Sequence, residues 1–439
     1  MSIKPSNLID LRASRRYKPD VVSLACRRVA AARHQTGLSR PAFASSLQPL
    51  LGWTPSPEVI KSWESAVAPP GEVVVACEVV SSQAAHGAQI LHSDASPKDT
   101  SPILATMPPP KTLNSADVSK ADARSVIAWV ESTNTSDDAI SYFAQAISRT
   151  AEEHASLPPA TLLLKVQQLH TMIRALLEGG RQRQSQASEL LCLDADLLAH
   201  LCQLLGDVHR DQAASAYAQA SMALANEAGA GPARAFSAQA QIARWRGRYA
   251  EAADLAAIGS RRNPPVHLRT LLAYQEADAA AVSGQVRRAR TLLERADSMD
   301  DGSTSYSAWS CPPGRRALFR MGVALNLGDA HGALRQAAEA EPAWQRERSR
   351  AFGTWAHFQI TAAKAHTTLA SIDGATDQVA PVLDLPREYR ISTLVGHMAT
   401  LDSLLLRQRF RNSRGVVALR ERLRHFSDGT LEQTNAEES

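Results

Sequence analysis

The sequence predicts an all-α protein with two helical domains joined by a linker. Alanine, leucine and arginine are abundant in its 439 residues, and only 5% of residues are aromatic. This composition favours helices over sheets. Apolar residues recur at i, i+3, i+4 and i+7 over much of the chain, as in "ATLLLKVQQLHTMIRALLEGG" (160–180), which is the period of an amphipathic helix. A chain of this length is expected to contain more than one domain.

Composition divides the chain into three regions. Residues 18–81 alternate apolar and polar positions at helical spacing. Residues 82–120 are rich in Ser, Pro, Thr and Asp and include Pro108–Pro110, which predicts a flexible linker with some polyproline character. Residues 121–426 are predicted to form a second, larger helical domain, and the polar tail after them is expected to fray.

Cysteine usage and hydropathy indicate the expected compartment. The cysteines are Cys26, Cys77, Cys192, Cys202 and Cys311, an odd number without a CxxC pair, which argues against a disulfide framework and a structural zinc site. No apolar run approaches the ~20 residues of a membrane span, and the first residues lack a signal-peptide core. We therefore expect a cytoplasmic protein without a membrane partner. The net charge of +4 permits nucleic-acid binding but does not by itself indicate it.

The first domain is predicted to begin with three short helices. One covers 26–36, and a second covers 40–51 behind Ser39, a residue type that caps helix N-termini. A third starts at Pro57 behind Ser56, because Pro is favoured at the first helical position. A short turn between the second and third helices matches the helix-turn-helix geometry that docks in the major groove of DNA. A helical corner without contact to DNA is the alternative interpretation.

Helical periodicity assigns the faces of these helices. On the third helix, Val59, Ile60 and Trp63 are expected to face the core, whereas Lys61, Ser62 and Ser65 face outward and Glu58 lies near the N-terminus. On the first helix, Arg27, Arg28 and Arg33 are expected to face outward. The third helix would therefore present polar side chains.

A degenerate repeat occurs in the second domain. The segments "GRYAEA" (247–252), "GQVRRA" (284–289) and "GDAHGA" (328–333) each follow one amphipathic helix and begin another. In the first copy the residues Gly247, Tyr249, Ala252 and Pro264 have the spacing of a tetratricopeptide repeat. The copies are 37 and 44 residues apart, longer than the usual ~34, so the extra length is assigned to loops such as 301–315. An irregular helical array is the alternative.

Arrays of this kind offer a concave face lined by the first helix of each pair. The candidate groove residues are Arg234, Gln241, Arg244, Tyr274, Asp278 and Asn326, with Trp245 and Arg315 beside them. Such a lining suits an extended peptide, with the arginines binding a carboxylate. A solvated groove face without a ligand is the alternative.

The segments "GLSRPAFA" (37–44) and "VIKSWES" (59–65) resemble the Cro/repressor (XRE-type) helix-turn-helix, which has a lambda-repressor-like fold. The matching residues are Gly37, Leu38, Ser39, Ala44, Ile60, Trp63, Glu64, Pro69 and Pro70. Segments such as "WVESTNTSDDAISYF" (129–143) and "ARWRGRYAEAADLA" (243–256) resemble actinobacterial regulators in which this domain precedes tetratricopeptide repeats.

The resemblance implies a DNA-binding transcriptional regulator. Its repeats would sense a peptide or small-molecule effector or mediate dimer or partner binding, and a homodimer would bind operator DNA. The residues placed at the DNA are Arg40, Ser56, Glu58, Lys61 and Ser62. The basic N-terminal arm, with Arg12, Arg15, Arg16 and Lys18, could track a phosphate backbone or enter a minor groove, and a solvated disordered arm is the alternative. Three departures affect this site. Arg40 stands where the family usually has Gln, and Lys61–Ser62 stand where it commonly has two basic residues before Trp. Ser65–Ala66 replace Arg-Gly, which removes a phosphate contact.

The other function considered is a tetratricopeptide-type protein-interaction adaptor with a vestigial helix-turn-helix. An enzyme is not expected, because the sequence lacks a Walker-type loop, HExxH and GxSxG. No cofactor is expected, and the histidine spacings do not indicate a metal site. Cys311, in "SAWSCPP" (307–313), is the one cysteine placed in a loop and the candidate for a redox role.

Overall fold

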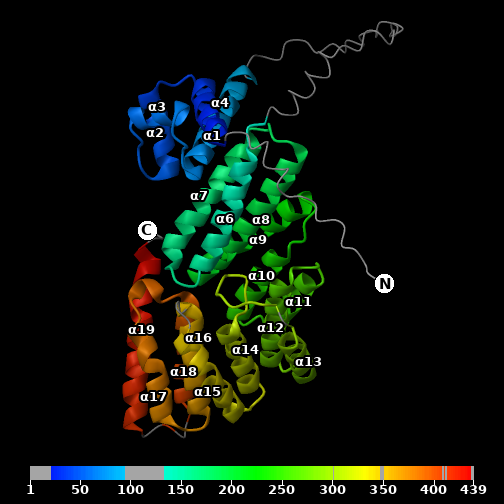
Figure 1. Ribbon diagram of the computed structural model, residues 1–439. Coiled ribbons are helices and arrows are strands. Elements are labelled where there is room, and N and C mark those ends of the chain that lie inside the picture. The colour runs from blue at the N-terminus through cyan, green and yellow to red at the C-terminus, as the bar shows by residue number, and fades with distance from the viewer. Residues whose placement is uncertain are drawn as a thin grey trace, which may run out of the picture. The chain divides into compact units, whose positions relative to one another are not determined.

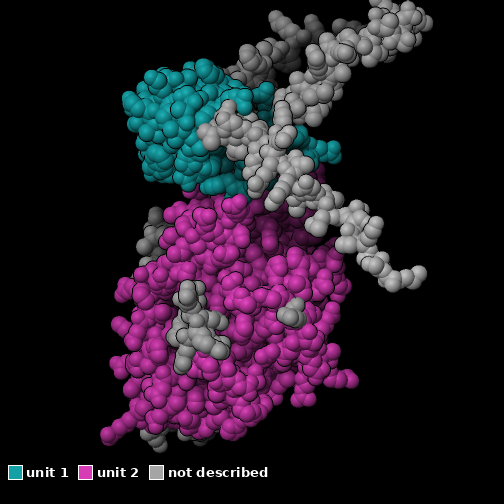
Figure 2. Space-filling model, in the orientation of Figure 1, with its two compact units in different colours: residues 1–142, 171–187 teal, residues 143–170, 188–439 magenta. Residues whose placement is uncertain are grey.

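All regular structure in the described part of the chain is helical. The computed structural model describes residues 21–93, 133–299, 301–346, 351–407, 410 and 413–436, and these residues contain no strand (Figure 1). The chain divides into two compact units (Figure 2), one made of residues 1–142 and 171–187 and the other of 143–170 and 188–439. Within the described residues, no helix has the length and apolarity needed to cross a bilayer.

Unit 1 is built around four helices: α1 (Val21–Thr36), α2 (Arg40–Leu51), α3 (Pro57–Ser65) and α4 (Gly71–Ser93). Both α2 and α3 begin where the sequence predicts, and α1 starts five residues earlier than expected. Helix α1 packs on α3 and α4, and α2 packs on the same two helices. Their shared core includes Val29, Phe43, Leu47, Ile60 and Trp63.

The predicted linker begins later than the sequence indicates. Residues 82–93 belong to α4 and are not part of a flexible linker. The apolar run at 73–80 continues into "SQAAHGAQILHS", whose Ala, Gln and Leu residues favour a helix more than its Ser and Gly oppose one. The rest of the predicted linker, 94–120, and the first residues of the predicted repeat domain, 121–132, lie outside the described residues.

The following helices continue to the C-terminus. They are α6 (Asp137–Glu153), α7 (Pro159–Glu178), α8 (Gln184–Asp207), α9 (Asp211–Glu227), α10 (Ala233–Trp245), α11 (Tyr249–Ser260), α12 (Val266–Val282), α13 (Val286–Asp297), α14 (Pro313–Asn326), α15 (Ala330–Arg346), α16 (Phe352–Thr368), α17 (Ile372–Leu383), the 3-10 turn η2 (Arg387–Tyr389), α18 (Ser392–Leu405) and α19 (Arg414–Ala436). The division between the two units passes within α6, α7 and α8.

Unit 2 has the helical-repeat architecture that the sequence predicts. From α10 onward the helices pack in consecutive pairs: α10 with α11, α12 with α13, α14 with α15, α16 with α17, and α18 with α19. The first helix of each pair also contacts the first helix of the next pair (Figure 1). The helices α10, α12, α14, α16 and α18 therefore form an inner layer, and their partners form an outer layer.

The repeated glycines and alanines explain this pairing. Gly247, Gly284 and Gly328 precede α11, α13 and α15 with φ of 73°, 77° and 87°, a left-handed conformation that glycine adopts without steric cost. The alanines five residues later, Ala252, Ala289 and Ala333, are at most 1% exposed. Because alanine is small, the two helices of a pair pack closely.

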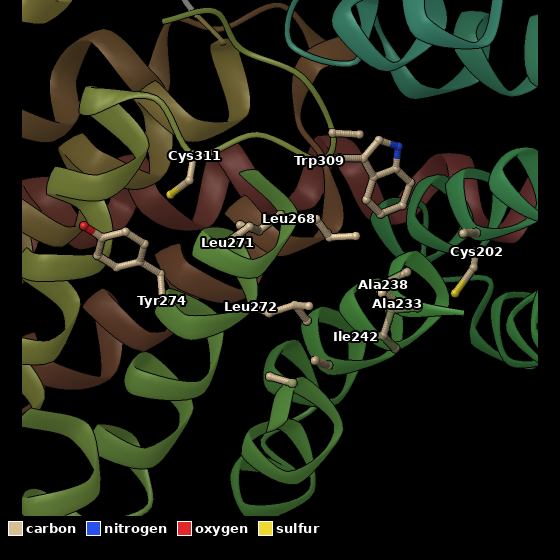
Figure 3. Close-up of a cluster of buried hydrophobic side chains, with 14 of the residues drawn as sticks. Cys202, Ala233, Ala238, Ile242, Leu268, Leu271, Leu272, Tyr274, Trp309 and Cys311 are labelled. Atoms are coloured by element: carbon tan, nitrogen blue, oxygen red, sulfur yellow. The ribbon is translucent and has the colours of Figure 1, made fainter. Parts of the chain in front are cut away.

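The loop between α13 and α14 is part of the core. Ala308, Trp309 and Cys311 are buried among side chains of α8, α10 and α12 (Figure 3). The prediction that this segment adds loop length is confirmed for residues 301–312, which contain no helix or strand, whereas the last predicted loop residues, 313–315, begin α14. Burial raises the pKa of the Cys311 thiol to about 12. The thiol is therefore protonated at neutral pH and inaccessible, which contradicts the redox role considered for it.

Candidate functional sites

The first candidate site is the exposed surface of α2 and α3 in unit 1. Ser39 Oγ accepts a hydrogen bond from Ala42 N at 3.4 Å, and Ser56 Oγ accepts one from Val59 N at 3.3 Å. Each serine thereby satisfies a backbone donor at a helix N-terminus. The two helices are thus capped where the sequence predicts, and Ser56 uses its side chain for the cap.

Arg40, predicted to contact DNA, has a partner within the protein. Its Nε lies 2.7 Å from Glu64 Oε2, while Arg33 pairs with the other oxygen, Oε1. Burial alone would raise the pKa of Glu64, but the hydrogen bonds and charges of Arg33 and Arg40 hold it below its usual value. Helical periodicity predicts that Arg33 faces outward. That is wrong, because this ion pair draws its side chain inward to 15% exposure.

The remaining predicted DNA contacts lie on α3. Glu58 and Lys61 are exposed and Ser62 is half-buried. Val59, expected in the core, is 37% exposed, because α1 and α2 pack on the side of this nine-residue helix that carries Ile60 and Trp63. The exposed face of α3 therefore carries one acid and one base. The basic arm, Arg12, Arg15, Arg16 and Lys18, lies outside the described residues.

The Arg33–Glu64–Arg40 cluster yields a stability prediction. Glu64→Gln is expected to destabilise unit 1 by about 2 kcal/mol, because it leaves two arginines beside a neutral amide. Hydrogen exchange of the amides of α1 and α3 in the full chain measures the change. Glu58→Gln, on the exposed end of α3, is the matched control and is expected to cost less than about 1 kcal/mol. Equal effects of the two substitutions would contradict the structural role of Glu64.

The second candidate site is a cavity of about 190 Å³ in unit 2. Side chains of α8 and of all five inner-layer helices line it, together with residues at the end of α6 and in the loop before α14. A larger hollow of about 760 Å³ adjoins this cavity, and both are lined by Arg244, Trp245, Leu325, Asn326, Lys364, Thr393 and His397. The two spaces therefore form one continuous groove with a narrow inner part.

Four of the six predicted groove residues line this cavity: Gln241, Arg244, Asp278 and Asn326. Arg234 and Tyr274 do not. Arg234 pairs with Asp196 of α8, and its guanidinium lies 5.8 Å from the centre of the Trp309 ring. Tyr274 is fully buried, stacks on Phe319 of α14 and hydrogen-bonds Asp297. Neither residue lines the cavity, since Tyr274 is covered by neighbouring helices and the half-buried Arg234 is held by Asp196 and Trp309.

A row of glutamine side chains crosses the cavity wall. Gln203 Nε2 of α8 donates to Gln241 Oε1 of α10 at 3.4 Å, and Gln275 Nε2 of α12 donates to the same oxygen at 3.3 Å. Ser237 Oγ donates to Gln275 Oε1 at 2.9 Å. Side-chain amides thus connect α8 with the inner-layer helices α10 and α12 along the cavity wall.

Two basic residues of the inner layer, Arg244 of α10 and Lys364 of α16, also line the cavity. Arg244 Nε lies 2.6 Å from Asp278 Oδ2, so this pair neutralises itself. Lys364 Nζ lies 3.1 Å from His397 Nδ1, and the ring of His397 stacks on His357 with centroids 3.8 Å apart. Burial and the charge of Arg244 lower the pKa of Lys364 to about 7. Its ammonium form is therefore only partly populated at neutral pH.

A third group of titratable side chains lies at the end of the cavity near α6. His154 Nδ1 is 3.1 Å from His200 Nε2, and His154 Nε2 is 3.8 Å from Asp207 Oδ2. Burial lowers the pKa of His154 to about 4 and raises that of Asp207 to about 8. Both groups are thus mainly neutral at pH 7, despite their proximity.

Asp207 gives a prediction about pH and stability. Its folded pKa lies above its unfolded value, so the folded state binds the extra proton and stability falls as pH rises toward 8. Asp207→Asn removes this dependence. The variant is expected to gain stability over the wild type from pH 5 to 8, by at most about 1.4 kcal/mol per pH unit. Urea unfolding at several pH values measures the difference, with exposed Asp254→Asn as control. A difference that stays constant with pH would contradict the assignment.

Sequence reasoning missed several residues of the cavity, namely His154, Asp207, His357, Lys364 and His397. One of these residues has a signal in the sequence. Lys364 is surrounded mainly by small and apolar residues in "ITAAKAHTT" (360–368), and lysines are almost never fully buried unless they have a partner. The described residues contain no group of three or more His, Cys, Asp or Glu side chains arranged to hold a metal ion.

Comparisons with known proteins add little. No protein-family model matches the chain, and no curated protein matches it. Among solved structures, it is similar to a chain in the crystal structure of the APC/C hetero-tetramer Cut9-Hcn1, with 13% identity, coverage of 92% of this chain and 86% of that chain, and a TM-score of 0.35. A TM-score this low carries no argument about function. The description of helical repeats therefore rests on the helix pairing of this chain itself.

Proposed function

We propose that unit 2 is a binding module that takes up an extended segment of a protein partner. The observation that carries this proposal is the continuous groove: a cavity of about 190 Å³ shares its lining with a hollow of about 760 Å³. Ligand sites in proteins usually have ≈ 300–1,000 Å³, so the combined space suits several peptide residues better than a small molecule alone.

The chemistry of the lining also fits a peptide. Gln203, Gln241, Gln275 and Asn326 supply amide donors and acceptors, which match the N–H and C=O groups of an extended backbone. Leu318, Phe319 and Trp245 add apolar surface in the same space. Amide groups for the backbone and apolar surface for the side chains are together suited to recognition of an extended chain.

Selection from a random peptide display library against the full chain tests this function. Enriched peptides are expected to bind Gln241→Ala about tenfold more weakly than the wild type. The substitution removes the oxygen that accepts hydrogen bonds from Gln203 and Gln275 in the groove wall. The control is Gln336→Ala on outer-layer helix α15, which does not line the groove and is expected to leave affinity unchanged. Failure to enrich any peptide, or equal losses in both variants, would rule out the groove as a peptide site.

A second candidate function is DNA binding by unit 1. The observation that favours it is the capped pair α2 and α3, joined by a short turn, with Lys61 on the exposed face of α3. In that case the chain is a transcriptional regulator and the ligand of unit 2 is its effector. The exposed face of α3 carries few charged side chains, and Arg40 is paired with Glu64. Both observations favour the adaptor alternative, in which unit 1 no longer binds DNA.

The salt dependence of binding to selected genomic fragments distinguishes these two functions. A regulator is expected to enrich a short motif, and Lys61→Ala is expected to weaken binding and reduce the salt slope by about one unit. Lys165→Ala, an exposed lysine of α7, is the control that leaves both unchanged. Binding without sequence preference at every salt concentration would identify the adaptor. The homodimer that the family resemblance implies stays a prediction.

A further inference from the structure

Arg315 is a cation of the groove without a carboxylate partner. It lies in the first turn of α14 and lines the inner cavity. Its Nη1 donates to three backbone carbonyls of the preceding loop, those of Ser307, Ala308 and Ser310, at 3.3, 3.3 and 2.9 Å. Among the described residues no carboxylate lies within ion-pair distance of it, although most buried arginines in proteins have one.

The loop carbonyls fix the guanidinium but leave part of it available. Arg315 has five N–H donors in a planar fork, and the hydrogen bonds recorded for it involve Nη1 alone. Its other nitrogens, Nε and Nη2, have no acceptor among the described residues. In the described part of the chain, Asp207 is the one carboxyl group whose charge acts on Arg315, and burial raises the pKa of Asp207 to about 8, so that it is mainly neutral at pH 7. The positive charge of Arg315 is thus uncompensated.

A second side chain of the same cavity has a hydrogen-bond acceptor without a donor. Gln203 is 2% exposed and lines the cavity. Its Nε2 donates to Gln241, but its Oε1 accepts no hydrogen bond within the described structure. A buried acceptor without a donor costs free energy. A ligand that donates a hydrogen bond to this oxygen would remove that cost.

We propose that the inner cavity binds the carboxylate of an organic acid or peptide, with Arg315 receiving the carboxylate and Gln203 Oε1 accepting a hydrogen bond from a nearby N–H or O–H of the ligand. A carboxylate fits the free edge of a guanidinium fork in bidentate geometry. Lys364, which is partly protonated at neutral pH, adds positive potential to the same space.

The size of the cavity limits what enters it. A cavity of about 150 Å³ accommodates benzene, so 190 Å³ accommodates one side chain with its terminal carboxylate. The acid group is therefore either the end of a peptide, an acidic side chain of one, or a small acylated amino acid. This inference deepens the function proposed for unit 2, but its first test does not depend on that function.

The first test compares N-acetyl-leucine with N-acetyl-leucinamide by calorimetric titration of the full wild-type chain. Both carry the N–H donor, and only the first carries a carboxylate. The acid is expected to bind at least about tenfold more tightly than the amide. Equal binding of the two, or no binding of the acid at millimolar concentration, would overturn the proposal. No variant is needed for this comparison.

Variants then locate the site. Arg315→Gln is expected to reduce affinity for the acid at least about tenfold, and Arg315→Lys to restore part of it because the charge is retained. Arg320→Gln is the matched control: it lies on the same helix, pairs with Asp297 and does not line the cavity. An Arg320→Gln loss as large as that of Arg315→Gln would contradict the assignment to Arg315.

Peptides from the display selection identify the source of the carboxylate. Each is titrated as the free acid, as the C-terminal amide, and with its Asp and Glu replaced by Asn and Gln. A tenfold loss in one of these forms supports the proposal and names the group that enters. Peptides that bind equally in all three forms would overturn it while the peptide-binding function stands. Binding of N-acetyl-leucine without any enriched peptide would support it and refute the peptide function.

Discussion

Close packing of alanine-rich helices is the constraint on which the structure of unit 2 depends. Consecutive inner helices contact each other, and each also contacts its outer partner. Small side chains permit this, as at Ala277, Ala280 and Ala289, which are fully buried between neighbouring helices. Larger residues there would separate the helices, because protein interiors have no spare volume. The same contact places long polar side chains of the inner helices around a common space.

Enclosure of charged groups by these helices gives the cavity its chemistry. Lys364, His357 and His397 lie on neighbouring inner helices and all have pKa values lowered by burial. Asp207 is affected in the opposite direction, toward its neutral form. Burial thus favours the neutral form of each of these four groups, whether it is reached by losing or by gaining a proton. Arginine cannot lose its proton at neutral pH, so Arg315 keeps its charge.

The sequence predicted the positions of the helices better than it predicted which of their side chains line the groove. Capping serines such as Ser56, the glycines before α11, α13 and α15, and the apolar period are local signals, so element positions followed from them. The side chains that line the groove could not be predicted in this way, because they depend on which helix faces are covered by neighbouring helices. Helix α12 is buried along nearly its whole length, so its period could not distinguish Tyr274, which is covered by α14, from Asp278, which faces the cavity. The ion pair of Arg40 with Glu64 could not be predicted for a similar reason, since the two residues lie 24 positions apart in the sequence.

The most direct test of the binding account is a crystal structure of the full chain with N-acetyl-leucine or the tightest selected peptide. The account predicts ligand density between α8 and α14, with a carboxylate against the guanidinium of Arg315 and a donor within hydrogen-bond distance of Gln203 Oε1. Ligand bound outside the groove, or a carboxylate held elsewhere in it while Arg315 contacts only the carbonyls of the preceding loop, would contradict the account.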